Sequence, residues 1–279
     1  MSIRSRINQR LAQYGRVAIW GAGGLGRTAM RYWIPGRKVK LVIDSNAVPN
    51  DFLGEHVVTH PKFADFSGID AVVICTSAHI SARRDLTACG YTGPVFYVYE
   101  LFLPETDVQL TELEALAVDI AITKNNSWPL FLLLKPQILV NVTFRLGNWA
   151  GKSLLRLPLY LLFFILHQLA CLLFSIQLPL KTPIGPGLLF AHYGTIVFTE
   201  RARIGSFFTI YHGCTVGTND SGQGPVIGDF VYQYAGSHIL GRCLIGDRSR
   251  VGANSVALDI DCPAESTLIG VPARIAIRQ

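Results

Sequence analysis

A bulky, mostly aliphatic residue opens a unit of six residues again and again through residues 181–279. The series is Ile184, Phe190, Phe198, Ile204, Ile210, Val216, Ile227, Gln233, Ile239, Ile245, Val251 and Ala257, with a two-residue excess before Phe198 and a loop from Gly217 to Val226. Small residues come fifth in several units: Cys214, Ser237, Cys243, Ser249 and Ser255. A period of six predicts a left-handed parallel β-helix, a triangular prism in which three units make one coil. Twelve units therefore predict four coils.

Residues in every third unit stack on the same side of such a prism. The third residues of one such set are His192, His212, Ala235 and Ala253. Because neighbouring strands lie ~5 Å apart, the two histidines are expected side by side. The two alanines beyond them leave a clear channel in which an extended acyl carrier can lie.

Residues 1–103 alternate short β-branched runs with helical stretches, which predicts a Rossmann-like α/β domain with a parallel sheet. The expected strands are Val17–Trp20, Val39–Ile43, 71–76 and 95–99. The first runs into a glycine-rich turn with Gly21, Gly23, Gly24 and Gly26, and the second ends at Asp44. Such a turn lets a phosphate approach backbone N–H groups, and the acid can bind ribose hydroxyls. The alternative is a degenerate domain that only packs or oligomerises.

A linker helix is expected over residues 104–127, followed by an apolar, basic helical segment over 128–180. No Asp or Glu lies between Asp119 and Glu200, whereas that interval holds Lys124, Lys135, Arg145, Lys152, Arg156 and Lys181. The uncharged stretch 157–180 is long enough to span a bilayer, but a polar stripe that includes His167 favours an amphipathic helix. We expect this segment to lie on anionic lipid or, alternatively, to form a subunit contact. His167 itself is expected to be a hydrogen-bonded interior residue.

The composition excludes several classes of protein. Half of the 279 residues are hydrophobic and 16% are charged, so a disordered chain is excluded. The net charge of +6 is not a dense Lys/Arg stripe, and nucleic acid is not an expected partner. The six cysteines form no Cys-x-x-Cys pair, and no secretory leader pattern is present, so we expect no metal site and a reducing cytoplasm.

From about Ser127 onward the chain resembles hexapeptide acyltransferases of the serine acetyltransferase type, in particular their polysaccharide O-acetyltransferase branch. The resemblance is carried by the stretches 144–149, 184–187, 191–197, 210–217 and 270–275. It implies acetyl-CoA as donor, a homotrimer with active sites between prisms, and His192 as catalytic base. A neutral imidazole removes the proton of a hydroxyl as it attacks the thioester, and backbone N–H groups stabilise the oxyanion.

The same resemblance implies roles for further residues. Ala235, Gly236 and Ala253 would flank the pantetheine arm, and Arg250 and Arg274 would bind the CoA phosphates or be ordinary surface charges. His212 would assist or shape the pocket, and His238 would be structural. Glu200 is a further candidate for a carboxylate that orients the catalytic base or binds the acceptor, although a structural role is the stronger expectation.

Three departures from the family's serine enzymes fall around the acceptor. Ala191 stands where they carry Asp, Gly224 where they carry a second histidine, and Gln177 where they carry the carboxylate that orients the base. Gln177 can hydrogen-bond an imidazole but cannot stabilise its positive form by charge. These departures favour a neutral, polyhydroxyl acceptor.

Residues 15–103 loosely resemble the amino-terminal domain of bacterial nucleotide-sugar acyltransferases, through Gly21–Gly26, Asp44 and Arg83. The resemblance implies a nucleotide or nucleotide-sugar ligand.

The sequence thus predicts an acetyl-CoA-dependent O-acetyltransferase that acts on a sugar hydroxyl of a bacterial surface polysaccharide or its precursor, at the inner face of the plasma membrane. The alternatives are a serine O-acetyltransferase, a nucleotide-sugar N-acetyltransferase, and a non-catalytic scaffold whose prism only trimerises.

Overall fold

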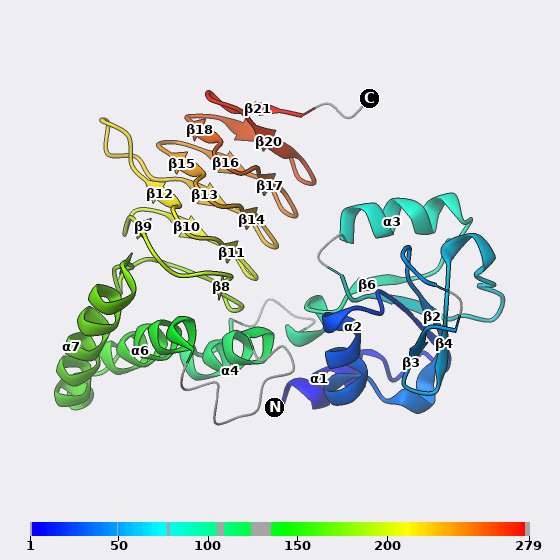
Figure 1. Ribbon diagram of the computed structural model, residues 1–279. Coiled ribbons are helices and arrows are strands. Elements are labelled where there is room, and N and C mark those ends of the chain that lie inside the picture. The colour runs from blue at the N-terminus through cyan, green and yellow to red at the C-terminus, as the bar shows by residue number, and fades with distance from the viewer. Residues whose placement is uncertain (1, 49, 77–78, 105–108, 124–134, 277–279) are drawn as a thin grey trace. The chain divides into compact units, whose positions relative to one another are not determined.

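The computed structural model describes residues 2–48, 50–76, 79–104, 109–123 and 135–276 (Figure 1). The chain divides into two compact units, Met1–Val108 and Gln109–Gln279. The predicted start of the apolar segment at residue 128 and the charge of Lys124 lie outside the described residues.

The amino-terminal unit is built on an open sheet. Its elements are α1 (Ile3–Arg10), β1 (Val17–Trp20), α2 (Gly24–Thr28), the π-helix η1 (Ala29–Trp33), η2 (Gly36–Lys38), β2 (Val39–Ile43), β3 (Phe52–Leu53), β4 (His56–Thr59), η3 (Pro61–Phe63), β5 (Ala71–Ile74), α3 (His79–Ala88), β6 (Val95–Tyr97) and η4 (Glu100–Phe102). The strand order is β3-β4-β2-β1-β5-β6. All pairings are parallel except that between β3 and β4.

The two central strands of this sheet, β1 and β5, are buried along their whole length. Continuous apolar runs of this kind are typical of parallel strands covered on both faces. Figure 1 shows α3 on one side of the sheet and α1 with α2 on the other. The chain runs from β1 to β2 in one direction and from β5 to β6 in the other, so right-handed crossovers place α2 and α3 on opposite faces.

All four strands expected from the sequence are present, and β5 and β6 end two residues earlier than predicted. The prediction missed β3 and β4. These strands form a short antiparallel hairpin in which Gly54, with φ of +65°, makes the turn. Strands of two and four residues are too short to show a clear alternation of apolar and polar residues.

The carboxyl-terminal unit begins with α4 (Glu112–Thr123), α6 (Pro136–Gly151), η5 (Leu154–Arg156) and α7 (Leu157–Phe174). Helix α4 packs against α6, so the expected linker helix belongs to this unit. Helix α7 ends earlier than the apolar stretch 157–180, because Ser175 adopts a left-handed conformation with φ of +53°. The next two residues already form a strand of the prism.

The remaining strands form the prism: β7 (Ile176–Gln177), β8 (Leu189–Phe190), β9 (Ile196–Phe198), β10 (Arg203–Ile204), β11 (Thr209–Ile210), β12 (Thr215–Gly217), β13 (Val226–Ile227), β14 (Tyr232–Gln233), β15 (His238–Leu240), β16 (Leu244–Ile245), β17 (Arg250–Val251), β18 (Val256–Leu258), β19 (Asp261–Cys262), β20 (Thr267–Ile269) and β21 (Arg274–Ile275). They make three sheets, β10-β13-β16-β19, β21-β20-β17-β14-β11-β8 and β18-β15-β12-β9-β7. All pairings within them are parallel except that of β20 with β21. The parallel β-helix predicted from the repeat is confirmed.

The residues that open the predicted units line the interior of the prism. Ile239, Ile245 and Val251 are at most 3% exposed and belong to one hydrophobic core. The small fifth residues are buried as expected, at 0% for Cys214 and 1% for Ser255. The prism extends beyond Ala257 through the buried residues Cys262 and Leu268. The sequence series stopped before them because the step from Ala257 to Cys262 is five residues rather than six.

Candidate active site

His192 lies two residues after the inward-facing Phe190, at the corner where the chain leaves β8. The backbone N–H of Ala191 donates a hydrogen bond of 2.9 Å to the Ile210 carbonyl, which fixes the strand up to this point. Gly194, with φ of +107°, then turns the chain toward β9. The backbone of His192 is therefore fixed between the buried Phe190 and the turn at Gly194, while its side chain is exposed.

The predicted column of third residues is confirmed by the strand register. Phe190 pairs with Ile210, and each is followed two residues later by a histidine. The ring centroids of His192 and His212 are 5.6 Å apart, and the Tyr211 ring lies 5.5 Å from that of His192. Among the described residues, no side chain hydrogen-bonds either imidazole. Both rings are exposed in the single chain and are free to contact a substrate.

The column continues through Ala235 and Ala253, because Gln233 pairs with Val251 in the next two strands. Asn254 donates its backbone N–H to the Ala235 carbonyl at 3.0 Å, so the two turns are stacked. Gly236 has φ of +70° and donates to the His212 carbonyl. A Cβ atom at position 236 would lie 2.2 Å from Asn254 Oδ1, so the turn requires glycine there. Among the described residues, the third residues that continue the column beyond the histidines, Ala235 and Ala253, carry only methyl side chains.

The two arginines predicted to bind CoA phosphates lie on the same sheet as this column. Arg250 is on β17 and half-buried, and Arg274 is on the antiparallel strand β21 and exposed. Arg250 pairs with Thr267, and Arg274 pairs with Ile269 on the same intervening strand, β20. Their role in phosphate binding stays a prediction.

Gln177 is not hydrogen-bonded to His192 among the described residues. It lies on β7, where it pairs with Val197 on a different sheet from β8. Its side chain lines a cavity of about 620 Å³ together with Gln168, Ser175 and Thr195. Within one chain, Gln177 therefore lines an uncharged, largely apolar cavity beside the first strand of the prism, and its predicted role as the group that orients the imidazole stays untested.

Glu200 and His238 do not join the histidine pair. Glu200 is exposed in the turn after β9, and His238 is on β15, where it pairs with Thr215 and Val256.

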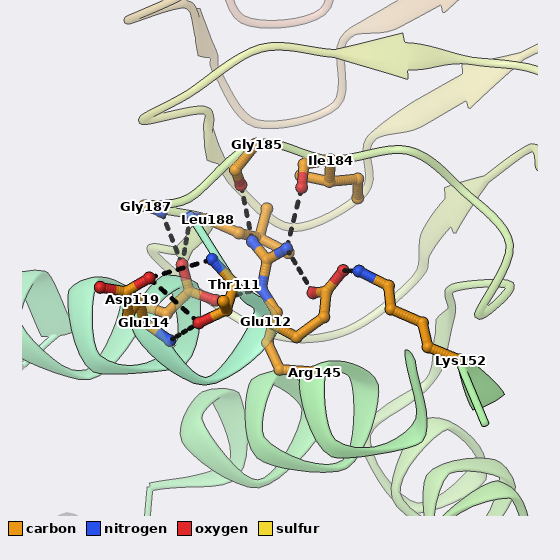
Figure 2. A network of polar contacts seen from close by, with 10 residues as sticks. All are labelled: Thr111, Glu112, Glu114, Asp119, Arg145, Lys152, Ile184, Gly185, Gly187 and Leu188. Carbon is orange, nitrogen blue, oxygen red and sulfur yellow. Dashed lines mark hydrogen bonds and ion pairs between the residues drawn. The ribbon is translucent and has the colours of Figure 1, made fainter. Parts of the chain in front are cut away.

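A buried ion pair connects the helices to the segment just before His192 (Figure 2). Asp119 of α4 is fully buried, and its Oδ2 accepts a hydrogen bond of 2.9 Å from Arg145 Nε of α6. Its Oδ1 accepts from the backbone N–H groups of Gly187 at 2.6 Å and Leu188 at 2.9 Å. Burial raises the pKa of Asp119, and the Arg145 guanidinium and these N–H donors oppose that rise.

Arg145 uses its remaining donors on the same segment. Its two terminal nitrogens donate to the carbonyl oxygens of Ile184 at 2.8 Å and Gly185 at 2.6 Å. Glu112 lies 3.4 Å from this guanidinium and 3.1 Å from Lys152 Nζ. Asp119 and Arg145 thus hydrogen-bond to both ends of the segment 184–188, which leads into β8, and through β8 they position His192. Arg145 is therefore buried in an ion pair and is not one of the surface charges of the middle segment, which corrects the expectation of a basic surface at this position.

The sequence analysis did not identify Asp119 as a positioning residue. The signal was present, because the buried residues Ala115, Val118 and Ile122 define one face of α4 and Asp119 falls on that face. An acid on the apolar face of an amphipathic helix is expected to have a buried partner.

His167 is an interior histidine, as predicted. It is 0% exposed, its Nε2 donates to the Leu178 carbonyl at 2.7 Å, and its Nδ1 lies 3.0 Å from Thr143 Oγ1. Burial lowers its pKa, and the hydrogen bond to Leu178 opposes this effect. It joins α6, α7 and the start of the prism and takes no part in the histidine pair.

A second cavity, of about 520 Å³, lies at the carboxyl ends of β1, β2 and β5 in the amino-terminal unit. It is lined by the predicted residues Gly21, Gly23, Gly24 and Asp44, together with Ser45, Thr76 and Asp85 among others. Gly26 is not among them and has a packing role, because a Cβ atom there would lie 1.9 Å from the Gly21 carbonyl oxygen. A Cβ atom on Gly23 would meet no atom within 4 Å. Asp44 accepts hydrogen bonds of 2.8 Å from the N–H groups of Ala22 and Asn46, so its carboxylate closes the glycine turn itself.

No protein-family model matches the chain. A serine acetyltransferase of Helicobacter pylori (strain J99) is 36% identical over 152 residues, which cover 53% of this chain and 85% of the relative. A serine acetyltransferase of Synechococcus elongatus is 31% identical over 150 residues, covering 53% of this chain and 59% of the relative.

Solved structures give the same result. A serine acetyltransferase in complex with CoA matches with a TM-score of 0.51 and 27% identity, over 60% of this chain and 70% of that one. Neisseria gonorrhoeae serine acetyltransferase matches with a TM-score of 0.51 and 25% identity, over 66% of this chain and 72% of that one. Because the hexapeptide prism and these relatives agree, the chain belongs to the serine acetyltransferase family of hexapeptide-repeat acyltransferases.

Proposed function

We propose that this enzyme transfers the acetyl group of acetyl-CoA directly to an aliphatic hydroxyl group, with His192 as the general base. The observation that carries the proposal is the exposed His192–His212 pair, at 5.6 Å between ring centroids, followed along the prism by two alanines. A neutral His192 takes the proton of the acceptor hydroxyl as its oxygen attacks the thioester carbonyl. The same imidazole then returns the proton to the departing CoA thiolate, so no acyl-enzyme is formed.

The CoA-bound relative supports acetyl-CoA as donor. In this chain, the column past Ala235 and Ala253 has room for the pantetheine arm, and Arg250 and Arg274 on the same sheet have the charge that the CoA phosphates need.

The comparisons favour serine as the acceptor. The relatives reported above are named serine acetyltransferases, and they support the alternative of the sequence analysis better than the sugar acceptor that it put first. Serine O-acetylation is therefore the first candidate reaction.

A sugar hydroxyl is the second candidate, because of one feature of the loop before β13. Gly224 stands where the serine enzymes of the resembled family carry a histidine, and a Cβ atom at this position would lie 2.5 Å from the Arg201 carbonyl oxygen. The loop of this chain therefore has no room for a side chain there. Ala191 likewise offers no carboxylate next to His192. A site without these charged partners suits a neutral polyhydroxyl acceptor.

One assay separates the two acceptors. The rate of CoA release from acetyl-CoA is measured with L-serine, with free hexoses and with nucleotide-sugars, for the native enzyme and for His192→Ala. Saturable release with serine that is lost in the variant supports the first candidate, and release with a sugar but not with serine supports the second. Release that persists in the variant, or no release with any hydroxyl acceptor, would contradict the proposal.

We also propose that a homotrimer is the active form. Exposure of both His192 and His212 in the single chain supports a site that a second prism closes. Light scattering after gel filtration measures the mass, and a monomer with full activity would overturn this part.

For the amino-terminal unit, we propose a nucleotide or nucleotide-sugar ligand in the 520 Å³ cavity. Support comes from its position at the carboxyl ends of parallel strands, next to a change in strand order. Calorimetric titration with uridine and adenosine diphosphates and with their sugar conjugates tests it. Gly23→Ala would weaken binding without unfolding the unit, and no heat with any of these ligands would count against the proposal.

A further inference from the structure

The short helix η5, which connects α6 to α7, and helix α7 itself expose an unusual amount of apolar surface. Residues Leu154–Phe174 form a stretch of 21 residues, and its most apolar window of 18 residues has a mean hydropathy of 2.1 and is only 17% buried. The large apolar side chains that are at least 41% exposed are Leu154, Leu155, Leu157, Leu159, Leu161, Leu162, Phe164, Ile165, Leu166, Leu169, Leu172 and Leu173. We call these twelve residues the apolar face. A helix of this length and composition in the core of a soluble protein is mostly buried, and α7 is not.

The apolar face extends around most of the helix. Successive residues are rotated by about 100° in an α-helix, so the exposed apolar residues of α7 span an arc of about 220°. The buried residues His167, Ala170 and Cys171 occupy the opposite arc, against α6 and the prism. Gln168 is the one polar residue on the exposed arc of α7, which the structure describes in full, and it lines the 620 Å³ cavity that also contains Gln177. A partner helix typically covers a stripe of ~100°, so an arc of this width fits a surrounding apolar medium better than a second protein surface.

The charged residues that flank the apolar face in the sequence are all basic. Lys152 and Arg156 flank the η5 residues Leu154 and Leu155, and Lys181 follows the other end of the helix. Arg156 stacks on Trp149, with 4.2 Å between the guanidinium carbon and the ring centroid. No Asp or Glu occurs in the sequence between Asp119 and Glu200, and Glu112 of α4, which pairs with Lys152 at 3.1 Å, is only 18% exposed. A tryptophan and cations at the edge of an apolar surface are typical of contact with lipid headgroups.

The contacts of α7 exclude a simple span across the bilayer. His167 donates to the Leu178 carbonyl, and Ser175 alone separates the helix from strand β7 of the prism. A spanning α7 would draw this part of the prism and helix α6 into the hydrocarbon with it. A helix that lies in the plane of the membrane surface keeps the prism in water.

We propose that η5 and α7 bind the surface of an anionic lipid bilayer, with the apolar face inserted among the acyl chains and Lys152, Arg156 and Lys181 at the headgroups. This surface brings the acetyltransferase site to membrane-bound or membrane-proximal acceptors. The inference is independent of which hydroxyl the enzyme acetylates.

The test is flotation of the full-length protein with vesicles. Native protein is mixed with phosphatidylcholine vesicles or with vesicles that also contain phosphatidylglycerol, at low and high salt. The test variant is Leu154→Glu with Leu155→Glu, because these side chains are 90% and 95% exposed and their replacement leaves the core intact. The matched control is Val48→Glu with Phe63→Glu, which places two acids at positions 62% and 81% exposed in the amino-terminal unit. Acetyl transfer to a soluble acceptor and circular dichroism report on folding.

Native and control proteins should float with the phosphatidylglycerol vesicles, less so at high salt. The test variant should lose at least about tenfold in partitioning, because two leucines no longer enter the acyl region. The proposal is overturned if native protein stays with the soluble fraction at low salt, or if the test variant floats as well as the control. It is also overturned if the test variant instead breaks an oligomer larger than a trimer, since the apolar face would then be covered by a second copy of the chain.

Discussion

Replacing Asp119 by alanine should destabilise the carboxyl-terminal unit and slow catalysis. The carboxylate is 0% exposed and has three hydrogen-bonding or ionic partners: the Arg145 guanidinium and the two N–H groups of the segment before β8. Without it, a guanidinium whose side chain is 3% exposed lacks its principal counter-charge. Removing one partner of a buried ion pair costs ~3–5 kcal/mol.

The two backbone N–H groups add to this loss. Each buried donor left without an acceptor costs ~1–3 kcal/mol, but water can enter the space left by the side chain, and the losses are not additive within one network. We therefore expect the free energy of unfolding to fall by ~3–5 kcal/mol. Asp119→Asn keeps an oxygen acceptor for both N–H groups and should lose less. Domains are stable by only ~5–15 kcal/mol, so the alanine variant should unfold well before the native protein.

The matched control is Lys152→Met, at the other end of the same network. Lys152 is 64% exposed and pairs with Glu112 at 3.1 Å, so its loss should change stability by less than ~1 kcal/mol. Urea unfolding followed by circular dichroism measures the three variants at one pH. In the folded fraction of Asp119→Asn, kcat should fall more than KM changes, because a small displacement of β8 moves His192. Equal stability of Asp119→Ala and Lys152→Met would refute the assignment of Asp119 as a positioning residue.

Two further predictions concern packing. Burial lowers the pKa of His167, so below pH 6.5 the unfolded chain binds a proton more readily than the folded chain. The contribution of this group to the free energy of unfolding should be constant above that pH and should fall below it, by at most ~1.4 kcal/mol per pH unit. His167→Gln should reduce that slope. An unchanged slope in urea titrations of the variant would contradict this assignment. Gly26→Ala should unfold the amino-terminal unit, since its Cβ atom would lie 1.9 Å from a carbonyl oxygen, whereas Gly23→Ala has open space and should melt within a few degrees of the native protein. Equal melting of the two glycine variants would contradict the difference.

The prism could be predicted from sequence because its repeat is strict. Each unit places one bulky residue inside, and register follows by counting three units, which correctly stacked His192 on His212 and Ala235 under Ala253. The count failed only where the step changed, at Cys262. The glycine turn after β1 could also be predicted from the sequence, because the neighbouring backbone leaves no room for a side chain at Gly21 or Gly26 and the glycines are therefore a visible signal.

The links between elements could not be predicted in this way. Nothing in the spacing shows that Asp119 binds the N–H groups of Gly187 and Leu188, nearly seventy residues later. Arg145 was counted as a surface cation because its partner lies just outside the acid-free segment. The position of Gln177 relative to His192 likewise depends on how β7 joins the prism, which local pattern does not specify.

The most direct test of the account is the rate of acetyl transfer by His192→Ala compared with His212→Ala, with both variants shown to fold by circular dichroism. If His192 is the general base, its loss should lower kcat by ~10²–10⁴-fold, and the His212 variant should retain much more activity. A His192→Ala enzyme that transfers acetyl groups within a fewfold of the native rate would contradict the central claim.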